Sequence, residues 1–238
     1  FSPSPYLLER LSHHANAGRN QYAPMNGIPE LRQAIAELTR HCYGRAVCAE
    51  SEVTLASGAT EALFVAIQAI VRAGDEVILL DPAYDSYEPA IALAGGCKRI
   101  ALLPPHYQPD WQKIADAVSA KTRLIMVNSP HNPTASVFTD SDWRALEALA
   151  EKHNLYVISD EVYEHIVFER ERLGANAYPA LARRSFVISS FGKTFHATGW
   201  KLGYCIAPPE LSQEFRKVHQ FVTFTSFTPA QYAIADML

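Results

Sequence analysis

Polar and charged residues follow five short apolar runs of this 238-residue chain, and their types suit covalent and acid–base chemistry. A lysine can condense with a carbonyl group, a carboxylate can pair with a cation, and small residues at a helix start can bind an anion. Ligands in open α/β sheets bind beyond the carboxyl ends of the strands, so we expect these segments to meet at one edge. In chain order they are residues 57–61 (SGATE), 81–84 (DPAY), 128–134 (NSPHNPT), 159–163 (SDEVY) and 190–194 (SFGKT).

Three of the uncharged candidates also have ordinary structural explanations. Gly58-Ala59-Thr60 fits a phosphate site at a helix N-terminus, but a strand–turn–helix connection with a capping threonine uses the same residues. Tyr84 suits either a stacking surface or simple packing at the sheet edge. Asn132, between two prolines, is by default a turn residue.

The two charged candidates, Asp160 and Lys193, are open to similar alternatives. Asp160 ends an apolar run, so it caps the next segment, pairs with a surface base, or lies buried and needs a cationic partner. Lys193, taken alone, is typical of a solvated lysine. The histidines lack the spacing of H-E-x-x-H and no G-x-S-x-G is present, so neither a metal site nor a serine nucleophile is indicated.

Composition and charge exclude several classes of protein. The chain has 48% hydrophobic and 19% charged residues, a balance typical of a folded domain rather than a disordered tail. The formal charge is −4 and the basic residues are scattered, so no surface for nucleic acid or a membrane is predicted. Cys97 and Cys205 lie in apolar runs and predict buried, reduced thiols, which favours a cytoplasmic location.

The spacing of apolar residues predicts a repeated unit of strand, loop and helix. Strands that are apolar on both faces and separated by helices indicate an α/β fold, a three-layer sandwich around a mixed, mostly parallel sheet. Helices are expected around Leu63/Ile67/Ile70 and Trp143/Leu146/Ala150. The strands are expected at residues 53–55, 77–80, 124–127, 156–159, 186–189 and 204–207.

The two ends of the chain are expected to differ from this repeat. Prolines near the start predict an irregular arm and loop over residues 1–26, and Pro29 suits the first turn of the helix that follows. Residues 211–238 are predicted to be helical with an interruption at Pro229. The chain starts without Met and stops inside this helical stretch, so we expect a piece of a larger protein.

Taken together and in order, the polar segments resemble a known family. S-G-A-T-E-A, D-P-A-Y-D-S-Y, N-S-P-H-N-P-T, S-D-E-V-Y and S-S-F-G-K-T-F, followed by G-W-K-L-G-Y, are similar to motifs of the pyridoxal-phosphate aminotransferases of fold type I. The opening Y-A-P-M-N-G-I-P-E-L-R belongs to the same pattern, so the resemblance runs from about Tyr22 to the end. The chain is most similar to the branch that holds methionine aminotransferases and kynurenine/glutamine transaminases.

The resemblance implies a domain organisation. Residues 1–20 would be an N-terminal arm, a remnant of the small-domain region, and residues 21–238 the large domain that binds pyridoxal 5′-phosphate. The C-terminal small domain, which carries the arginine for the substrate α-carboxylate, is expected to be absent from this chain. The resemblance also implies a homodimer, in which Tyr22 reaches the phosphate in the neighbouring subunit.

The resemblance further implies a role for each candidate residue. Lys193 would form a Schiff base with the cofactor and move the proton at the substrate Cα, and Asp160 would pair with the pyridinium nitrogen. Tyr84 would stack on the ring, while Tyr163 and Asn132 would hydrogen-bond its 3-oxygen. The residues implied to hold the phosphate are Gly58, Ala59, Thr60, Ser190 and Lys201, together with Tyr22 of the neighbour.

Two positions depart from the usual pattern of the family. Lys201 stands where many members carry arginine, although the kynurenine/glutamine branch also has lysine there. Ala135 follows Asn132-Pro133-Thr134 where glycine is more usual, which is expected to alter that loop.

The function implied is transfer of the amino group of a neutral, sulfur-containing or aromatic L-amino acid, such as methionine, to a 2-oxo acid. Residues 221–227 (FVTFTSF) have three phenylalanines and no cation where dicarboxylate-specific relatives contribute an arginine, which disfavours aspartate. These phenylalanines equally fit core or dimer contacts. The alternatives that stay open are a cysteine-conjugate β-lyase with the same cofactor, a non-catalytic sensor domain that binds it, and a binding module without it.

Overall fold

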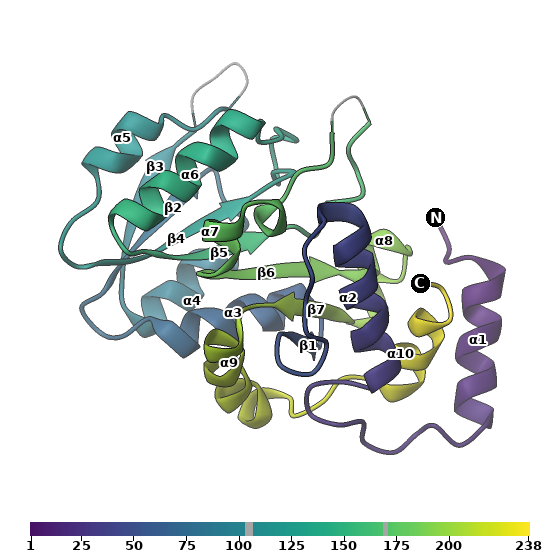
Figure 1. Ribbon diagram of the computed structural model, residues 1–238. Coiled ribbons are helices and arrows are strands. Elements are labelled where there is room, and N and C mark those ends of the chain that lie inside the picture. Colours follow the sequence, from purple (N-terminus) through teal and green to yellow (C-terminus); the bar gives the residue numbers. More distant parts are fainter. Residues whose placement is uncertain (103–106, 169–170) are drawn as a thin grey trace.

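The centre of the computed structural model, which describes residues 1–102, 107–168 and 171–238, is a seven-stranded sheet (Figure 1). The strand order is β1-β7-β6-β5-β4-β2-β3. β7 runs antiparallel to both of its neighbours, β1 and β6, and all other neighbouring strands are parallel. The strands are β1 Val53–Ala56, β2 Glu76–Asp81, β3 Gly96–Ala101, β4 Thr122–Asn128, β5 Tyr156–Asp160, β6 Ser185–Ser190 and β7 Gly203–Ile206.

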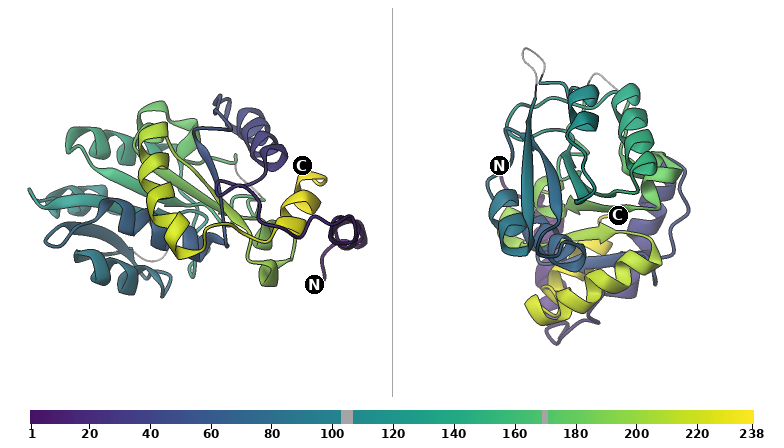
Figure 2. Two further views of the ribbon diagram at one scale, coloured as in Figure 1. Left: turned by 90° about the horizontal axis from the view of Figure 1, so that it is seen from below. Right: turned by 90° about the vertical axis from the view of Figure 1, so that its left-hand side faces the viewer.

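Helices cover both faces of the sheet and bury a separate apolar core on each (Figure 2). One face carries α1 Pro5–Asn16, α2 Pro29–Tyr43, α5 Trp111–Asp116, α6 Asp140–Lys152, α7 Pro179–Ala182 and α10 Thr228–Ala235. The other carries α3 Ala59–Ile70, α4 Tyr87–Ala94 and α9 Pro209–Val222. The short helices η1 Ala175–Ala177, α8 Phe191–Thr194 and η2 Thr198–Trp200 lie in the connections.

Alternation along the strands explains why both faces are covered. On β4, Ile125 and Val127 belong to one core, whereas Leu124 and Met126 belong to the other. Successive side chains of a strand point to opposite faces, so a strand that is apolar throughout needs helices on both sides. The predicted α/β sandwich with a mixed, mostly parallel sheet is confirmed, and all six predicted strands are present.

The sequence prediction missed one strand, β3, at the edge of the sheet. Among the described strands, β3 pairs with β2 alone at the edge of the sheet, and its described residues are half-buried or exposed. Cys97 on this strand is therefore half-buried, and the prediction that it is buried is wrong. Cys205 on β7 is buried as predicted, and none of the four cysteines forms a disulfide. The cytoplasmic location stays a prediction.

The N-terminal arm contains a helix, so the prediction of an irregular arm over residues 1–26 is wrong for α1. The hydroxyl of Ser4 accepts a hydrogen bond from the N–H of Leu7 at 3.2 Å and caps the helix, whose first position is a proline. Leu7 is fully buried, and α1 packs against α10 (Figure 1). Arg10 also forms an ion pair with Asp236 at 2.6 Å, which fixes the helix to the end of the chain.

At the chain ends, Pro29 begins α2 as predicted, and most of residues 211–238 is helical. The predicted interruption at Pro229 is wrong, because the break lies between α9 and α10, at residues 223–227, and Pro229 lies in the first turn of α10. No helix in the described parts of the chain is both long and apolar enough to span a membrane. The division at residue 20 into an arm and a large domain stays a prediction.

Candidate active site

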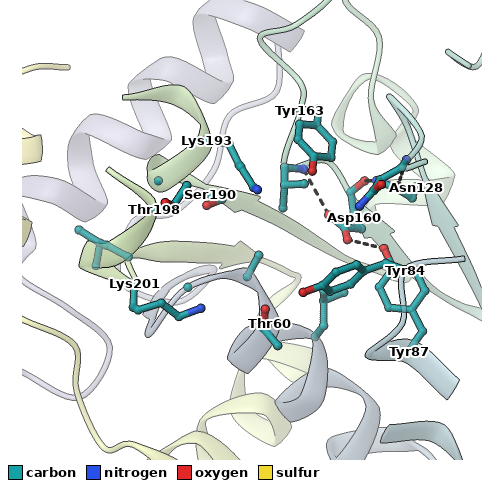
Figure 3. A pocket seen from close by; sticks show the side chains of 17 residues that line it. Thr60, Tyr84, Tyr87, Asn128, Asp160, Tyr163, Ser190, Lys193, Thr198 and Lys201 are labelled. Atoms are coloured by element: carbon teal, nitrogen blue, oxygen red, sulfur yellow. Dashed lines mark hydrogen bonds between the residues drawn. The ribbon is translucent and has the colours of Figure 1, made fainter. Parts of the chain in front are cut away.

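A cavity of about 190 Å³ lies at the carboxyl ends of β4, β5 and β6, beside the N-terminus of α3. Of the eleven site residues expected from the sequence, all except Tyr22 line it (Figure 3). The ten residues are Gly58, Ala59, Thr60, Tyr84, Asn132, Asp160, Tyr163, Ser190, Lys193 and Lys201. The sheet topology therefore brings together segments that are up to 143 positions apart (Gly58 to Lys201).

One end of the cavity carries groups of the kind that bind anions. Gly58 precedes α3 with a φ of +84°, a conformation that favours glycine, and the first N–H groups of a helix lack partners within the helix. A Cβ at Gly58 would come 3.4 Å from Cε of Lys201, so the lysine side chain lies directly over this turn. Thr60 and Ser190 add hydroxyl groups at the same end (Figure 3).

Both lysines of the cavity come from a single connection between β6 and β7. Because these strands are antiparallel neighbours, residues 191–202 begin and end at the same edge of the sheet. The N–H of Phe191 donates to the carbonyl oxygen of Leu202 at 3.1 Å and closes this connection. Lys193 lies on α8 with its Nζ 5.5 Å from the ring centre of Tyr163, and Lys201 follows η2.

Asp160 marks the other end of the cavity and is only 4% exposed. Its Oδ2 accepts a hydrogen bond from the hydroxyl of Tyr87, and its Oδ1 accepts one from the N–H of Val162 at 3.3 Å. Burial raises the pKa of Asp160 to about 6, while these two donors and the charge of Lys193 act in the opposite direction. Asp160 forms no ion pair with any residue that the structure describes.

Two residues that fix this end were not singled out from the sequence. Tyr87 is the first residue of α4, and its ring meets that of Tyr84 edge-on at 5.7 Å. Asn128 donates from Nδ2 to the carbonyl oxygen of Asp160 at 2.8 Å and accepts the N–H of Asn132 on Oδ1 at 2.7 Å. Both lie inside the motifs quoted above, and the end position of Asn128 on an apolar strand was the available signal.

The loop that carries Asn132 contains the departure noted at Ala135. Ala135 has a φ of +59°, in the left-handed region, which costs a non-glycine residue roughly 1 kcal/mol. The glycine that is more usual at this position would adopt the same conformation without that cost.

Tyr22, the eleventh expected residue, lies outside the cavity. Its side chain is 84% exposed, and its ring meets Phe224 edge-on at 5.6 Å. Phe221, Phe224 and Phe227 are also exposed, so the alternative that these phenylalanines belong to the core is wrong.

A second polar cluster lies behind the strand end that carries Asp160. Glu164 accepts hydrogen bonds from Ser189 and Tyr204 on Oε1, and from Tyr43 and Arg172 on Oε2, at 2.6 to 2.9 Å. Burial opposes its charge, but Arg172 and the hydroxyl of Ser189 outweigh this and hold the pKa of Glu164 below its usual value.

Glu161 lies next to this cluster, is buried, and forms no ion pair with any residue that the structure describes. Its Oε1 accepts the hydroxyl of Ser159 and the N–H of Ala175, both at 2.8 Å, whereas its Oε2 has no hydrogen-bond partner among the described residues. Burial and the nearby negative charge of Glu164 raise the pKa of Glu161 to about 8.

Comparison with known proteins agrees with this geometry. The family model described as aminotransferase class I and II matches residues 3–238. A methionine aminotransferase of Escherichia coli is 55% identical over all of this chain and 62% of its own length. A kynurenine–oxoglutarate transaminase of Dictyostelium discoideum is 36% identical over all of this chain and 59% of its own length.

A solved structure from Escherichia coli, described as identifying a methionine aminotransferase function, superposes on the whole chain. Its TM-score is 0.98 at 54% identity, and the match covers 63% of that structure's chain. The predicted similarity to this branch is confirmed. The chain spans about three fifths of the length of the curated relatives that it matches.

Proposed function

This chain belongs to the aminotransferase class I and II family, and on that premise we propose that it binds pyridoxal 5′-phosphate and transfers amino groups. The donor is a neutral, sulfur-containing or aromatic L-amino acid, methionine-like, and the acceptor is a 2-oxo acid. The observation that carries the proposal is the convergence of an anion site, a lysine, an aromatic ring and a buried carboxylate in one cavity. The name of the Escherichia coli relative supports methionine as the donor.

The groups in the cavity fit this cofactor. Asp160 is a buried carboxylate without an ion-pair partner in the described chain, and a protonated ring nitrogen would supply that partner. The turn at Gly58 and Lys201 offer N–H groups and a cation for a phosphate at the opposite end (Figure 3). Lys193 lies between the two ends.

Each side chain has a definite task in this proposal. When bound, the cofactor supplies an electron sink that stabilises negative charge at the substrate Cα. Nζ of Lys193 would hold the cofactor covalently and, as a free amine, would accept the proton from the substrate Cα and deliver it to the cofactor carbon that takes up the amino group. The Tyr163 hydroxyl and the Asn132 amide donate hydrogen bonds to the ring oxygen, and Tyr84 supports the ring face.

The exposed aromatic residues support a homodimer. Tyr22, Phe221, Phe224 and Phe227 leave large apolar side chains in solvent on neighbouring segments, and such patches commonly mark interfaces. A second copy that covers them would bring Tyr22 to the phosphate end of its partner's cavity. Light scattering at known concentration tests this, and a monomeric protein that transaminates at full rate would contradict it.

The cofactor assignment is tested by absorbance and chemical trapping. The purified protein with added pyridoxal 5′-phosphate should turn yellow, and borohydride should fix the label on Lys193, as read by peptide mapping. Lys193→Ala is the matched control and should show neither the band nor the label. A label on another lysine, or no label at all, would overturn the proposal.

The reaction is tested with a substrate panel. Methionine and phenylalanine should donate to a 2-oxo acid faster than aspartate, since residues 221–227 offer no cation for a second carboxylate. Aspartate as the best donor would contradict the substrate class. Release of pyruvate and ammonia from a cysteine conjugate without an acceptor would identify the β-lyase alternative instead.

A further inference from the structure

We propose that Tyr87 is a positioning residue of the cavity, whose hydroxyl keeps the Asp160 carboxylate ionised and oriented for a protonated ring nitrogen. The inference rests on the proposed function for the identity of the ring. The contact between Tyr87 and Asp160 itself is a property of this chain.

The position of Tyr87 suits this task. Its side chain is 3% exposed and belongs to the apolar core between α3, α4 and the sheet, where Ile91 of the same helix also lies. Packing thus fixes the ring, and the hydroxyl reaches Oδ2 of Asp160 (Figure 3). Burial and the charge of Asp160 raise the pKa of the Tyr87 phenol well above its usual value, so it remains a donor.

Among the described residues, no side chain other than that of Tyr87 donates a hydrogen bond to the Asp160 carboxylate. The only other described donor to the carboxylate is the N–H of Val162, at the long distance of 3.3 Å. Asn128 bonds the backbone carbonyl of Asp160 rather than its carboxylate, and Lys193 acts on it through its charge without forming an ion pair. Hydrogen bonds to a buried charged group are the strong ones, so the hydroxyl is the main side-chain counterweight to burial.

Removal of the hydroxyl has a defined chemical consequence. Without it, the Oδ2 of Asp160 would face the edge of an aromatic ring, and a proton on the carboxyl group would become more favourable. With the cofactor bound, a proton at this position would lie either on Asp160 or on the ring nitrogen. The Tyr87 hydroxyl therefore favours the pair of carboxylate and protonated nitrogen over two neutral groups.

The first experiment uses the cofactor-free protein. Carboxyl ¹³C NMR gives the titration of Asp160, assigned by the loss of its signal in Asp160→Asn. In Tyr87→Phe we expect the proton affinity of Asp160 to rise roughly tenfold, because one charge-assisted hydrogen bond is lost. A folded Tyr87→Phe with an unchanged Asp160 titration overturns the proposal.

Tyr178→Phe is the matched control. Tyr178 is also buried, and its hydroxyl donates to the carboxylate of Asp140 at 2.9 Å, but it does not line the cavity. This variant should leave the titration of Asp160 unchanged. An equal change in both variants would indicate a general loss of stability and would overturn the proposal.

The second experiment loads the proteins with pyridoxal 5′-phosphate. Tyr87→Phe should bind it roughly tenfold more weakly, and the ¹⁵N shift of the ring nitrogen should move toward the unprotonated form. Asp160→Asn has no carboxylate charge for the Tyr87 hydroxyl to act on. The double variant Asp160→Asn/Tyr87→Phe should therefore have the same affinity and the same ¹⁵N shift as Asp160→Asn alone. A lower affinity in the double variant overturns the proposal. If Asp160 titrates as expected but no protein binds the cofactor, the contact is supported and the proposed function fails.

Discussion

Asp160 and Glu161 are neighbours in the sequence but belong to two different regions, the cavity and the polar cluster behind it. Both carboxyl groups are buried, so both lose hydration and both have raised pKa values. Asp160 accepts a hydrogen bond from the hydroxyl of Tyr87, and the positive charge of Lys193 also acts on it. Both limit the rise caused by burial, and the pKa of Asp160 is about 6. Glu161 stands beside the ionised Glu164, and its pKa is about 8.

The difference shows that the partners of a buried carboxyl group set its charge, whereas burial alone does not. At neutral pH Asp160 is ionised and can pair with a cationic ligand, whereas Glu161 is neutral and accepts hydrogen bonds from Ser159 and Ala175. At the end of β5, Asp160 is thus ionised and able to bind a ligand in the cavity, whereas the neutral Glu161 holds the neighbouring backbone in place by hydrogen bonds. The predictions that follow test this division, beginning with the largest effect.

The largest effect should separate the two carboxyl groups by activity. Asp160→Asn removes the charge proposed to face the ring nitrogen, and the transamination rate should fall by about 10²- to 10³-fold. Glu161→Gln replaces a neutral acid by a neutral amide and should change the rate by no more than a few-fold. Steady-state rates with methionine measure both, and equal losses would refute the division.

The next effect concerns stability in the cluster. Glu164→Gln removes the ionised partner of Arg172, which is held at 2.6 Å, and should destabilise the protein by about 3 to 5 kcal/mol. Urea unfolding measures the change. Arg144, whose ion pair with Asp140 is exposed, provides the control, because Arg144→Gln should cost no more than about 1 kcal/mol.

The third effect is a pH dependence of stability. Both native pKa values are raised, so the native state binds more protons than the unfolded chain, and stability falls as pH rises through each window. The window of Asp160 runs from 3.8 to about 6 and should remove about 3 kcal/mol, and that of Glu161 runs from 4.5 to about 8.

Thermal unfolding over this pH range tests the assignment of each window. Asp160→Asn should remove only the fall in stability between pH 3.8 and about 6. Glu161→Gln should remove the fall that extends from pH 4.5 to about 8. A wild-type protein whose stability rises with pH between 4.5 and 8 would contradict the raised pKa of Glu161.

The smallest effect should come from the edge of the cluster. Tyr43 donates to Oε2 of Glu164 at 2.9 Å, and Tyr43→Phe should destabilise the protein by about 1 kcal/mol. The affinity for pyridoxal 5′-phosphate should not change, since Tyr43 does not line the cavity. A clear loss of affinity, measured by absorbance titration, would show that the two regions are coupled.

Local patterns in the sequence were sufficient for most of the fold. Continuous apolar runs predicted six strands, and helical spacing predicted α3 and α6, because burial on both sides of a sheet leaves a direct pattern. β3 was not predicted because an edge strand is only partly buried. α1 was not predicted because its prolines favour an irregular segment, and the helix depends on α10 to cover Leu7.

The sequence predicted those candidate residues whose chemical groups lie within a recognisable local motif. It did not predict contacts between residues that only the fold brings together. Lys193 and Asp160 became candidates from their position after apolar runs, and the resemblance of the combined motifs to a family assigned their roles. The hydroxyl of Tyr87 meets Asp160 across 73 positions, and no local pattern marks such a pair. Likewise, nothing in the consecutive letters of Asp160 and Glu161 distinguishes a group that faces the cavity from one that faces the interior.

The antiparallel direction of β7 has a consequence for protein engineering. Since residues 191–202 leave β6 and return to β7 at the same edge, the amine of Lys193 and the cation of Lys201 are attached to one short closed connection. Adding or deleting a residue there would alter the spacing between the lysine proposed to hold the cofactor and the lysine proposed to bind its phosphate. Grafting this connection intact, with the ends of both strands, would transfer both lysines in their native spacing.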